Sequence, residues 1–146
     1  MRLPLIFLAV LALAGCGSST AEEPAPGIAE GPPPLEQVED GNLTLYVSNQ
    51  SFERDDVDIL VFIDGRPAVD DSFDVGNQHN WIEFSFDLAD GKHTLYAESV
   101  AGEAVFEESF EMAAKRWAVI DYWCCDSMQD EPKFSFHLSS EPIGFA

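Results

Sequence analysis

Two adjacent cysteines, Cys124 and Cys125, are the side chains of this sequence best suited to covalent, redox or metal chemistry. Successive side chains of a β-strand point to opposite faces, so a disulfide between these neighbours requires a strand to end at them. The alternatives are a soft-metal site shared with a histidine, a nucleophilic thiolate, or inert thiols. The three histidines stand singly, as His79, His93 and His137. Because acidic residues flank the cysteine pair and disfavour a thiolate, we favour inert thiols or a vicinal disulfide.

Closely spaced aspartates form a second group of side chains that could do chemistry. The two main clusters consist of Asp55, Asp56, Asp58, Asp70, Asp71 and Asp74. Asp87 and Asp90 follow further along the chain. If loops bring three or four of these carboxylates together, they would suit Ca²⁺, which prefers oxygen ligands, although their spacing does not match an EF-hand loop. We favour a solvated acidic surface, because the chain has 27 acidic and only 7 basic residues.

Three tryptophans, Trp81, Trp117 and Trp123, are the candidate binding residues. In their runs of sequence they alternate with the more hydrophobic positions, so they belong to the opposite face of each expected strand. If these tryptophans are exposed, they would suit stacking on a sugar or contact with a protein. Covered by another layer, they would extend the core, and we favour this second interpretation because a sandwich buries one face of each sheet.

Motifs of catalysis are missing from the sequence. The 146 residues contain no HExxH, no GxSxG, no phosphate-binding loop and no dinucleotide-binding glycine pattern. The formal net charge of −20 repels polyphosphate, so the composition excludes an electrostatic nucleic-acid surface. We therefore expect no catalytic activity, no cofactor and no nucleic-acid partner.

The elements that must position these side chains are β-strands, because hydrophobicity repeats with a period of two almost throughout residues 41–146. Seven strands are predicted at residues 43–47, 57–64, 81–88, 92–100, 105–112, 117–124 and 134–138. Residues 68–73 would add a short eighth strand. The pair Asp64-Gly65 is a tight hairpin signal. The sequence thus predicts an all-β fold, an antiparallel sandwich of seven or eight strands over 41–146.

One stretch of this domain resembles bacterial immunoglobulin-like accessory domains. The resemblance rests on residues 57–65, which end at Asp64-Gly65, and on Asp90-Gly91-Lys92-His93-Thr94-Leu95-Tyr96-Ala97. It covers about a third of the chain and concerns the fold alone, so it implies an immunoglobulin-like β-sandwich and no catalytic residues.

The N-terminus has the features of a secretory signal over residues 1–15: a basic start, a short apolar run and small residues at its end. There, Leu13-Ala14-Gly15-Cys16 resembles the lipobox of bacterial lipoproteins. The resemblance implies cleavage after Gly15 and a diacylglyceryl group, commonly with a further palmitate-type acyl chain, on Cys16. Gly17 follows in place of an inner-membrane retention aspartate, which favours the outer membrane of a cell that has one.

Residues 16–40 are predicted to be a disordered linker. Residues 17–40 contain five prolines, six acidic residues and no Lys or Arg, a composition that cannot bury enough apolar surface to fold. We expect that removing residues 17–40 leaves the melting temperature of the domain nearly unchanged.

Taken together, the sequence predicts a lipid-anchored, non-catalytic binding or accessory module of the cell envelope. Its partners would be the membrane, through the lipid, and an envelope protein or glycan. The alternative is an envelope metal-binding protein or metal-dependent hydrolase that uses the loop carboxylates.

Overall fold

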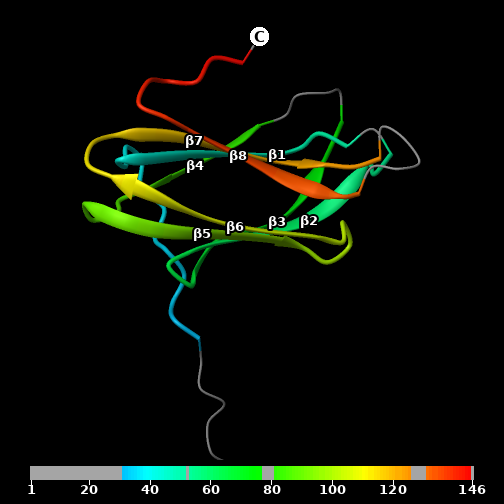
Figure 1. Cartoon of the computed structure of the whole chain (residues 1–146), viewed down its shortest axis with the longest axis horizontal. Helices are drawn as coiled ribbons and strands as arrows, with labels where there is room; N and C mark the ends of the chain where they lie inside the picture. Colours follow the sequence, from blue (N-terminus) through cyan, green and yellow to red (C-terminus); the bar gives the residue numbers. More distant parts are fainter. Residues whose placement is uncertain (1–30, 52, 77–80, 126–130, 146) are drawn as a thin grey trace, which may run out of the picture. The chain divides into compact units, whose positions relative to one another are not determined.

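The computed structural model describes residues 31–51, 53–76, 81–125 and 131–145, which form two layers of β-strands (Figure 1). The strands are β1 (Leu43–Asn49), β2 (Asp56–Ile63), β3 (Arg66–Asp74), β4 (Ile82–Phe86), β5 (Gly91–Ser99), β6 (Ala104–Met112), β7 (Arg116–Trp123) and β8 (Lys133–Ser139). The prediction of an all-β fold is confirmed. Within the described residues, no helix is long and apolar enough to cross a membrane. The predicted signal sequence, Cys16 and the first part of the linker lie outside these residues.

Each layer is a sheet of four strands, with the orders β4-β1-β7-β8 and β3-β2-β5-β6. The second sheet is antiparallel throughout. In the first sheet β1 pairs with β7 in parallel, from Leu43 opposite Arg116 to Asn49 opposite Tyr122, so this sheet is mixed. The prediction of a wholly antiparallel sandwich is therefore wrong. A period of two is common to parallel and antiparallel strands and cannot distinguish them.

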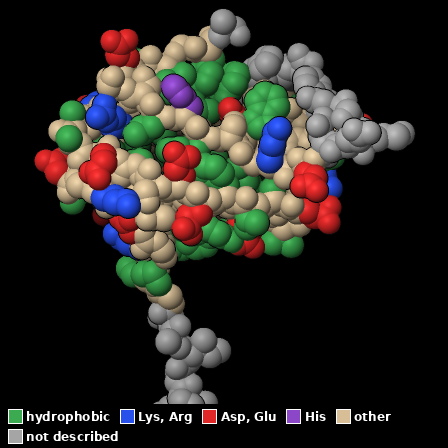
Figure 2. All heavy atoms as spheres, viewed as in Figure 1, with side chains coloured by type: hydrophobic (Ala, Val, Ile, Leu, Met, Phe, Trp, Pro, Cys, Tyr) green, Lys and Arg blue, Asp and Glu red, His purple; other side chains and the backbone are tan. Residues whose placement is uncertain are grey.

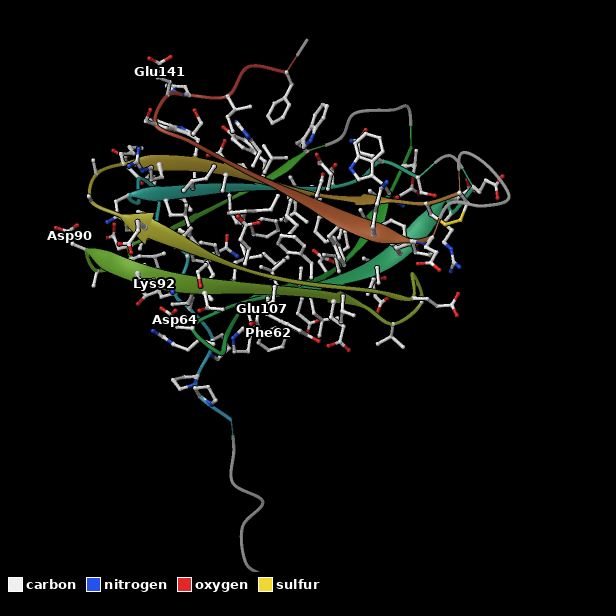
Figure 3. The ribbon with its side chains drawn as sticks, viewed as in Figure 1. Phe62, Asp64, Asp90, Lys92, Glu107 and Glu141 are labelled. Atoms are coloured by element: carbon white, nitrogen blue, oxygen red, sulfur yellow. A yellow bond between two sulfur atoms is a disulfide. The ribbon has the colours of Figure 1, made fainter. Side chains whose placement is uncertain are left out.

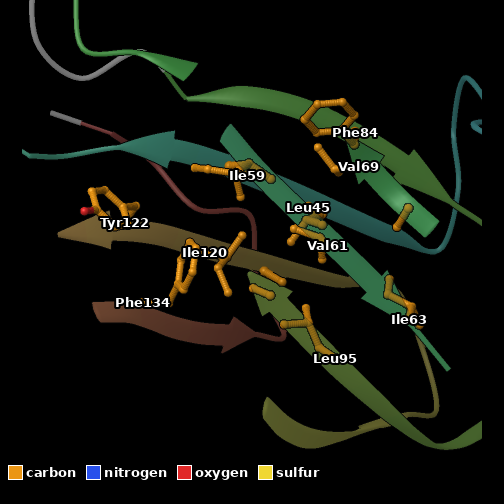
Figure 4. Close-up of a cluster of buried hydrophobic side chains, with 14 of the residues drawn as sticks. Leu45, Ile59, Val61, Ile63, Val69, Phe84, Leu95, Ile120, Tyr122 and Phe134 are labelled. Carbon is orange, nitrogen blue, oxygen red and sulfur yellow. The ribbon is translucent and has the colours of Figure 1, made fainter. Parts of the chain in front are cut away.

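The core lies between the two sheets and is built from alternate residues of each strand (Figure 4). In β2, one apolar face consists of Val57, Ile59, Val61 and Ile63, all of which are buried, as the alternation predicts. Phe84, Phe86 and Leu95, which alternate with more polar neighbours in their strands, are also buried, as is Ile120. β2 is an inner strand of its sheet, and its other face carries Asp56, Asp58, Leu60 and Phe62, which are partly or fully exposed.

The β2–β3 hairpin turns at Asp64 and Gly65, the pair that the sequence identified. Both residues have positive φ angles, 52° and 73°, as a tight two-residue hairpin turn requires. The Asp64 carboxylate also accepts hydrogen bonds from β5, including one from the Thr94 amide at 2.9 Å. The turn therefore fixes both the β2–β3 register and the contact of its tip with β5.

Part of the predicted linker, residues 31–40, contacts both sheets. The Leu35 amide donates to the Pro67 carbonyl of β3 at 2.7 Å, and the Val38 amide donates to the Ser85 carbonyl of β4 at 3.0 Å. The side chain of Leu35 packs against the core. In Figure 1 this blue segment runs from the lower layer to the upper one. It therefore bridges the edge strands β3 and β4 on one side of the sandwich.

Side-chain contacts hold the same segment at both of its ends. The Arg66 guanidinium donates to the carbonyls of Pro33 and Pro34, at 3.1 and 3.0 Å. Asp40 forms an ion pair with Lys115, which precedes β7. The compact unit thus begins at residue 31, and these ten residues differ from the expected disordered linker. Composition did not reveal this, because the segment is held by backbone hydrogen bonds and one partly buried leucine.

Two truncations measure how much this segment stabilises the fold. Removing residues 17–30 should leave the thermal midpoint unchanged, whereas removing residues 17–40 should lower the free energy of unfolding by about 1–3 kcal/mol. Each lost hydrogen bond is worth about 1 kcal/mol, and the entropy of ordering the segment offsets part of the gain. Differential scanning calorimetry of both variants is the measurement. Equal midpoints would contradict the contribution of residues 31–40.

Candidate functional site

The three predicted tryptophans lie on the outer side of the β4-β1-β7-β8 sheet, outside the core. In β7, alternate residues enter the core, so Trp117, Asp121 and Trp123 face outwards. Tyr46 of β1 shares this face, and Trp81 precedes β4 beside it. We call Tyr46, Trp81, Trp117 and Trp123 the outer aromatic face. Each ring is partly exposed, so the interpretation of these tryptophans as a second core layer is wrong.

A half-buried carboxylate, Asp121, lies at the centre of the outer aromatic face. The Trp81 indole donates to Asp121 Oδ1 at 2.9 Å, and the Ser48 hydroxyl donates to the same oxygen at 2.6 Å. Burial raises the pKa of Asp121, and these two hydrogen bonds oppose part of that increase. The carboxylate therefore fixes the orientation of the Trp81 ring.

The C-terminal segment covers one part of this face. Phe145 stacks on Trp81, with ring centroids 4.0 Å apart and an angle of 17° between the planes. The same ring forms a T-shaped contact with Tyr46, at a centroid distance of 5.0 Å. Figure 3 shows the segment that carries Glu141 on the outer side of this sheet. The Trp81 end of the face is therefore occupied by the chain itself.

The other two tryptophans are partly exposed. The indole of Trp123 donates to the Ser135 hydroxyl of β8 at 2.9 Å, and the ammonium of Lys115 lies 5.9 Å from the Trp117 ring centroid. Five residues of one strand separate the two tryptophans, which lie about 20 Å apart along it. Two flat, partly exposed rings at this spacing have the apolar area that suits stacking or protein contact.

The candidate metal-binding aspartates are spread over the β3-β2-β5-β6 sheet and its turns. Asp58 receives hydrogen bonds from the Ser99 hydroxyl and from the amides of Val100 and Ala101, at 2.8–3.0 Å. Burial alone would raise the pKa of Asp58, but these hydrogen bonds outweigh it and lower the pKa. This carboxylate therefore stabilises the β5–β6 turn.

Other aspartates have local roles of the same kind. Asp56 accepts a hydrogen bond from the Ser72 hydroxyl, and Asp74 accepts one from the Gly76 amide. The backbone carbonyl of Asp55 accepts a hydrogen bond from the Val75 amide. The carboxylate of Asp71 accepts one from the Ser72 amide. Among the described residues, no group of three or more His, Cys, Asp or Glu side chains could hold a metal ion. The β2–β3 register places Asp56 opposite Asp74, but the predicted group of three or four carboxylates does not form among the described residues.

Cys124 and Cys125 form a vicinal disulfide directly after β7 ends at Trp123. Cys125 has a positive φ of 67°, which marks the change of chain direction there. This is one of the two alternatives that the sequence favoured, with the strand ending as the disulfide requires. Cys124 is buried in the core and neither sulfur is a free thiol. His79 lies outside the described residues, so its proposed role as a metal ligand has no counterpart here.

His93 forms an ion pair with Asp64 that links β5 to the β2–β3 turn. Its Nδ1 lies 2.6 Å from Asp64 Oδ2, and its Nε2 lies 2.8 Å from the Ala89 carbonyl oxygen. Both partners are acceptors, so both ring nitrogens donate, as in the charged imidazolium. Burial alone would lower the pKa of His93, but the hydrogen bonds to Asp64 and Ala89 raise it above the ordinary 6.5. Although burial opposes the effect, hydrogen bonds from Thr94 and His93 lower the pKa of Asp64.

These two shifts predict how stability depends on pH. The raised pKa of His93 stabilises the fold below about pH 6.5, and this contribution is lost as the pH rises through the folded-state pKa. The lowered pKa of Asp64 stabilises the fold above about pH 4, and this contribution is lost as the pH falls through its folded-state pKa. Thermal midpoints measured from pH 5 to 9 should fall on the alkaline side. His93→Gln should reduce this fall, whereas replacing the exposed His137 by glutamine should preserve it.

The sequence did not identify a shallow groove on the opposite, outer side of the β3-β2-β5-β6 sheet. Its volume is about 380 Å³, and its lining comes from Phe62, Gly65, Thr94, Tyr96, Glu98 and Glu107. These residues come from β2, the β2–β3 turn, β5 and β6, so strand pairing brings them together. The alternation of apolar and polar residues in β2 and β5 indicates which side chains point outwards. It does not indicate which strands pair, and so which outward side chains become neighbours.

No protein-family model, curated protein or solved structure matches this chain. Two surfaces of the described residues are candidate binding sites, the outer aromatic face and the groove. They differ in chemistry: the outer aromatic face is rich in indole rings, whereas the groove combines two aromatic rings with two carboxylates.

Proposed function

We propose that this protein is a lipid-anchored, non-catalytic binding module of the bacterial cell envelope. Its domain would be an immunoglobulin-like β-sandwich that contacts an envelope protein or glycan through the outer aromatic face. The observation that carries the proposal is the pair of partly exposed rings, Trp117 and Trp123, on one strand of that face. Two sheets of four strands support the immunoglobulin-like architecture.

The anchor is supported by Leu13-Ala14-Gly15-Cys16 and by the apolar run before it. Two or more acyl chains give firm membrane attachment, at about 0.8 kcal/mol for each buried methylene. In a cell with an outer membrane, Gly17 in place of the retention aspartate favours that membrane as the destination. The anchor would keep the domain at the envelope, where its partner is.

Cys16→Ser tests the anchor. The variant should move from the membrane fraction to the soluble fraction and lose incorporation of an alkyne-tagged palmitate, with an unchanged thermal midpoint of the folded domain. A matched control is Ser18→Ala, two residues away, which should remain in the membrane fraction. A Cys16→Ser protein that stays in the membrane fraction would refute lipid anchoring.

A photo-crosslinking amino acid tests the binding surface. Placed at Trp117 or Trp123 of the anchored protein in intact cells, it should give a discrete adduct, whereas the same group at the exposed Val100 should give none. Adducts of the same pattern from all three positions, or from none, would contradict the outer aromatic face as the binding surface.

A further inference from the structure

The groove on the β3-β2-β5-β6 sheet has an aromatic floor and an acidic rim. In the strand registers Phe62 lies opposite Tyr96, and Tyr96 lies opposite Glu107, so these side chains form one row across three strands. The rings of Phe62 and Tyr96 have centroids 6.0 Å apart. Figure 3 shows Phe62 and Glu107 on the outer side of this sheet, away from the core. The groove therefore opens to solvent on the side opposite to the outer aromatic face.

The polar groups of this groove are mainly hydrogen-bond acceptors. The Tyr96 hydroxyl donates to Glu98 Oε2 at 2.8 Å, so the one phenolic donor is already used within the site. Glu98 and Glu107 retain free acceptor capacity, because an ionised carboxylate has about four lone-pair sites. A complementary ligand group must therefore supply mainly donors, with the Thr94 hydroxyl as the further polar group of the lining. A sugar hydroxyl, which needs both donors and acceptors, fits this set less well than a group that only donates.

The negative charge around the groove also favours a ligand group that donates hydrogen bonds, because such groups are often cationic. Glu107 and Glu98 belong to the outward row of a sheet that also carries Asp70 and Glu111, and Lys92 is the basic residue of the same face in β5. Figure 2 shows acidic side chains on both layers of the sandwich, with fewer Lys and Arg between them. The chain as a whole has a net charge of −20. The field at the groove therefore attracts cations.

We propose that this groove binds the guanidinium group of an arginine in a basic segment of a partner protein. A guanidinium has five N–H donors and no acceptor, which matches the carboxylates of Glu98 and Glu107. Its planar face stacks on aromatic rings, here Phe62 and Tyr96, through cation–π attraction. This site is separate from the outer aromatic face, so it gives the module a second contact on its other sheet.

Isothermal titration calorimetry of the full chain with a hexa-arginine peptide, in about 150 mM salt to screen distant charges, tests the proposal. Hexa-citrulline, which is neutral but similar in shape, serves as the ligand control. Glu107→Gln should weaken hexa-arginine binding by about tenfold, and Phe62→Leu should weaken it to a similar extent. The matched control is Glu108→Gln, which removes the same charge from the next residue of β6, on the other side of the strand. It should change the affinity by less than about twofold.

Three results would overturn the proposal. Equal weakening by Glu107→Gln and Glu108→Gln would show attraction by net charge alone. Equal affinity for hexa-citrulline would show that the charge of the ligand is not recognised, and an absence of hexa-arginine binding would show that the groove has no such function. The thermal midpoint of each variant establishes that it is folded, and the exposed Glu107 keeps the test valid if Phe62→Leu is unstable. None of these results bears on Cys16 or on the tryptophans.

Discussion

Phe86→Ala should lower the free energy of unfolding by about 3–5 kcal/mol, the cost of removing a buried aromatic ring and leaving a cavity. The Phe86 side chain is 0% exposed, in the core between the sheets. Phe86 also pairs with Leu43 of β1 and forms a bridge with Gln37, so the cavity would lie where three segments meet. Chemical denaturation followed by tryptophan fluorescence measures the change. The thermal midpoint should fall by 10 °C or more, at roughly 4 °C for each kcal/mol.

Ile82→Ala is the matched control, since Ile82 is in the same strand and on the same side of it. It is 42% exposed, so the loss should stay under about 1 kcal/mol. A Phe86→Ala protein no less stable than the Ile82→Ala protein would contradict the central role of Phe86 in the core.

Gly41→Ala should destabilise the fold by about 3 kcal/mol, at the upper end of the cost of overpacking. A Cβ at this buried position would stand 2.7 Å from the Phe86 amide nitrogen and still closer to its carbonyl group. Those are backbone atoms, so they cannot rotate away as a side chain could. The Gly41 amide also donates to the Ser85 hydroxyl at 2.8 Å, and this contact would be disturbed. Calorimetry should show a midpoint lower by on the order of 10 °C.

Gly144→Ala provides the comparison, because a Cβ there meets no atom within 4 Å. Its midpoint should equal that of the parent protein. If Gly41→Ala also leaves the thermal midpoint unchanged, the close approach of residue 41 to β4 is not required for the fold.

Much of the fold could be predicted because β-strands leave a local signal. The alternation in β2 identified Ile59 and Val61 as core, and Asp64-Gly65 identified the hairpin. The parallel pairing of β1 with β7 could not be predicted, since it depends on long-range pairing and leaves the period of two unchanged. The docking of residues 31–40 was hidden by the prolines and acids around Leu35.

The candidate site was predictable only in part, for a related reason. The alternation placed Trp117 and Trp123 opposite the core side of their strand, but it could not show whether another layer covers them. The groove was not predictable because Phe62, Tyr96 and Glu107 become neighbours only through the register of three strands. A surface formed by several strands depends on the tertiary structure and cannot be predicted from one strand. The buried face of a single strand can be predicted, because the alternation of its residues already shows it.

The segment of residues 35–38 has a consequence for association between copies of the protein. An unpaired edge strand can pair with the edge of another chain and begin aggregation. Here the hydrogen bonds of Leu35 and Val38 occupy parts of the edges of β3 and β4. The exposed Asp70 and Asp74 of β3 add like charges that oppose edge-to-edge pairing. The same short segment that joins the two sheets is therefore expected to limit strand-mediated self-association.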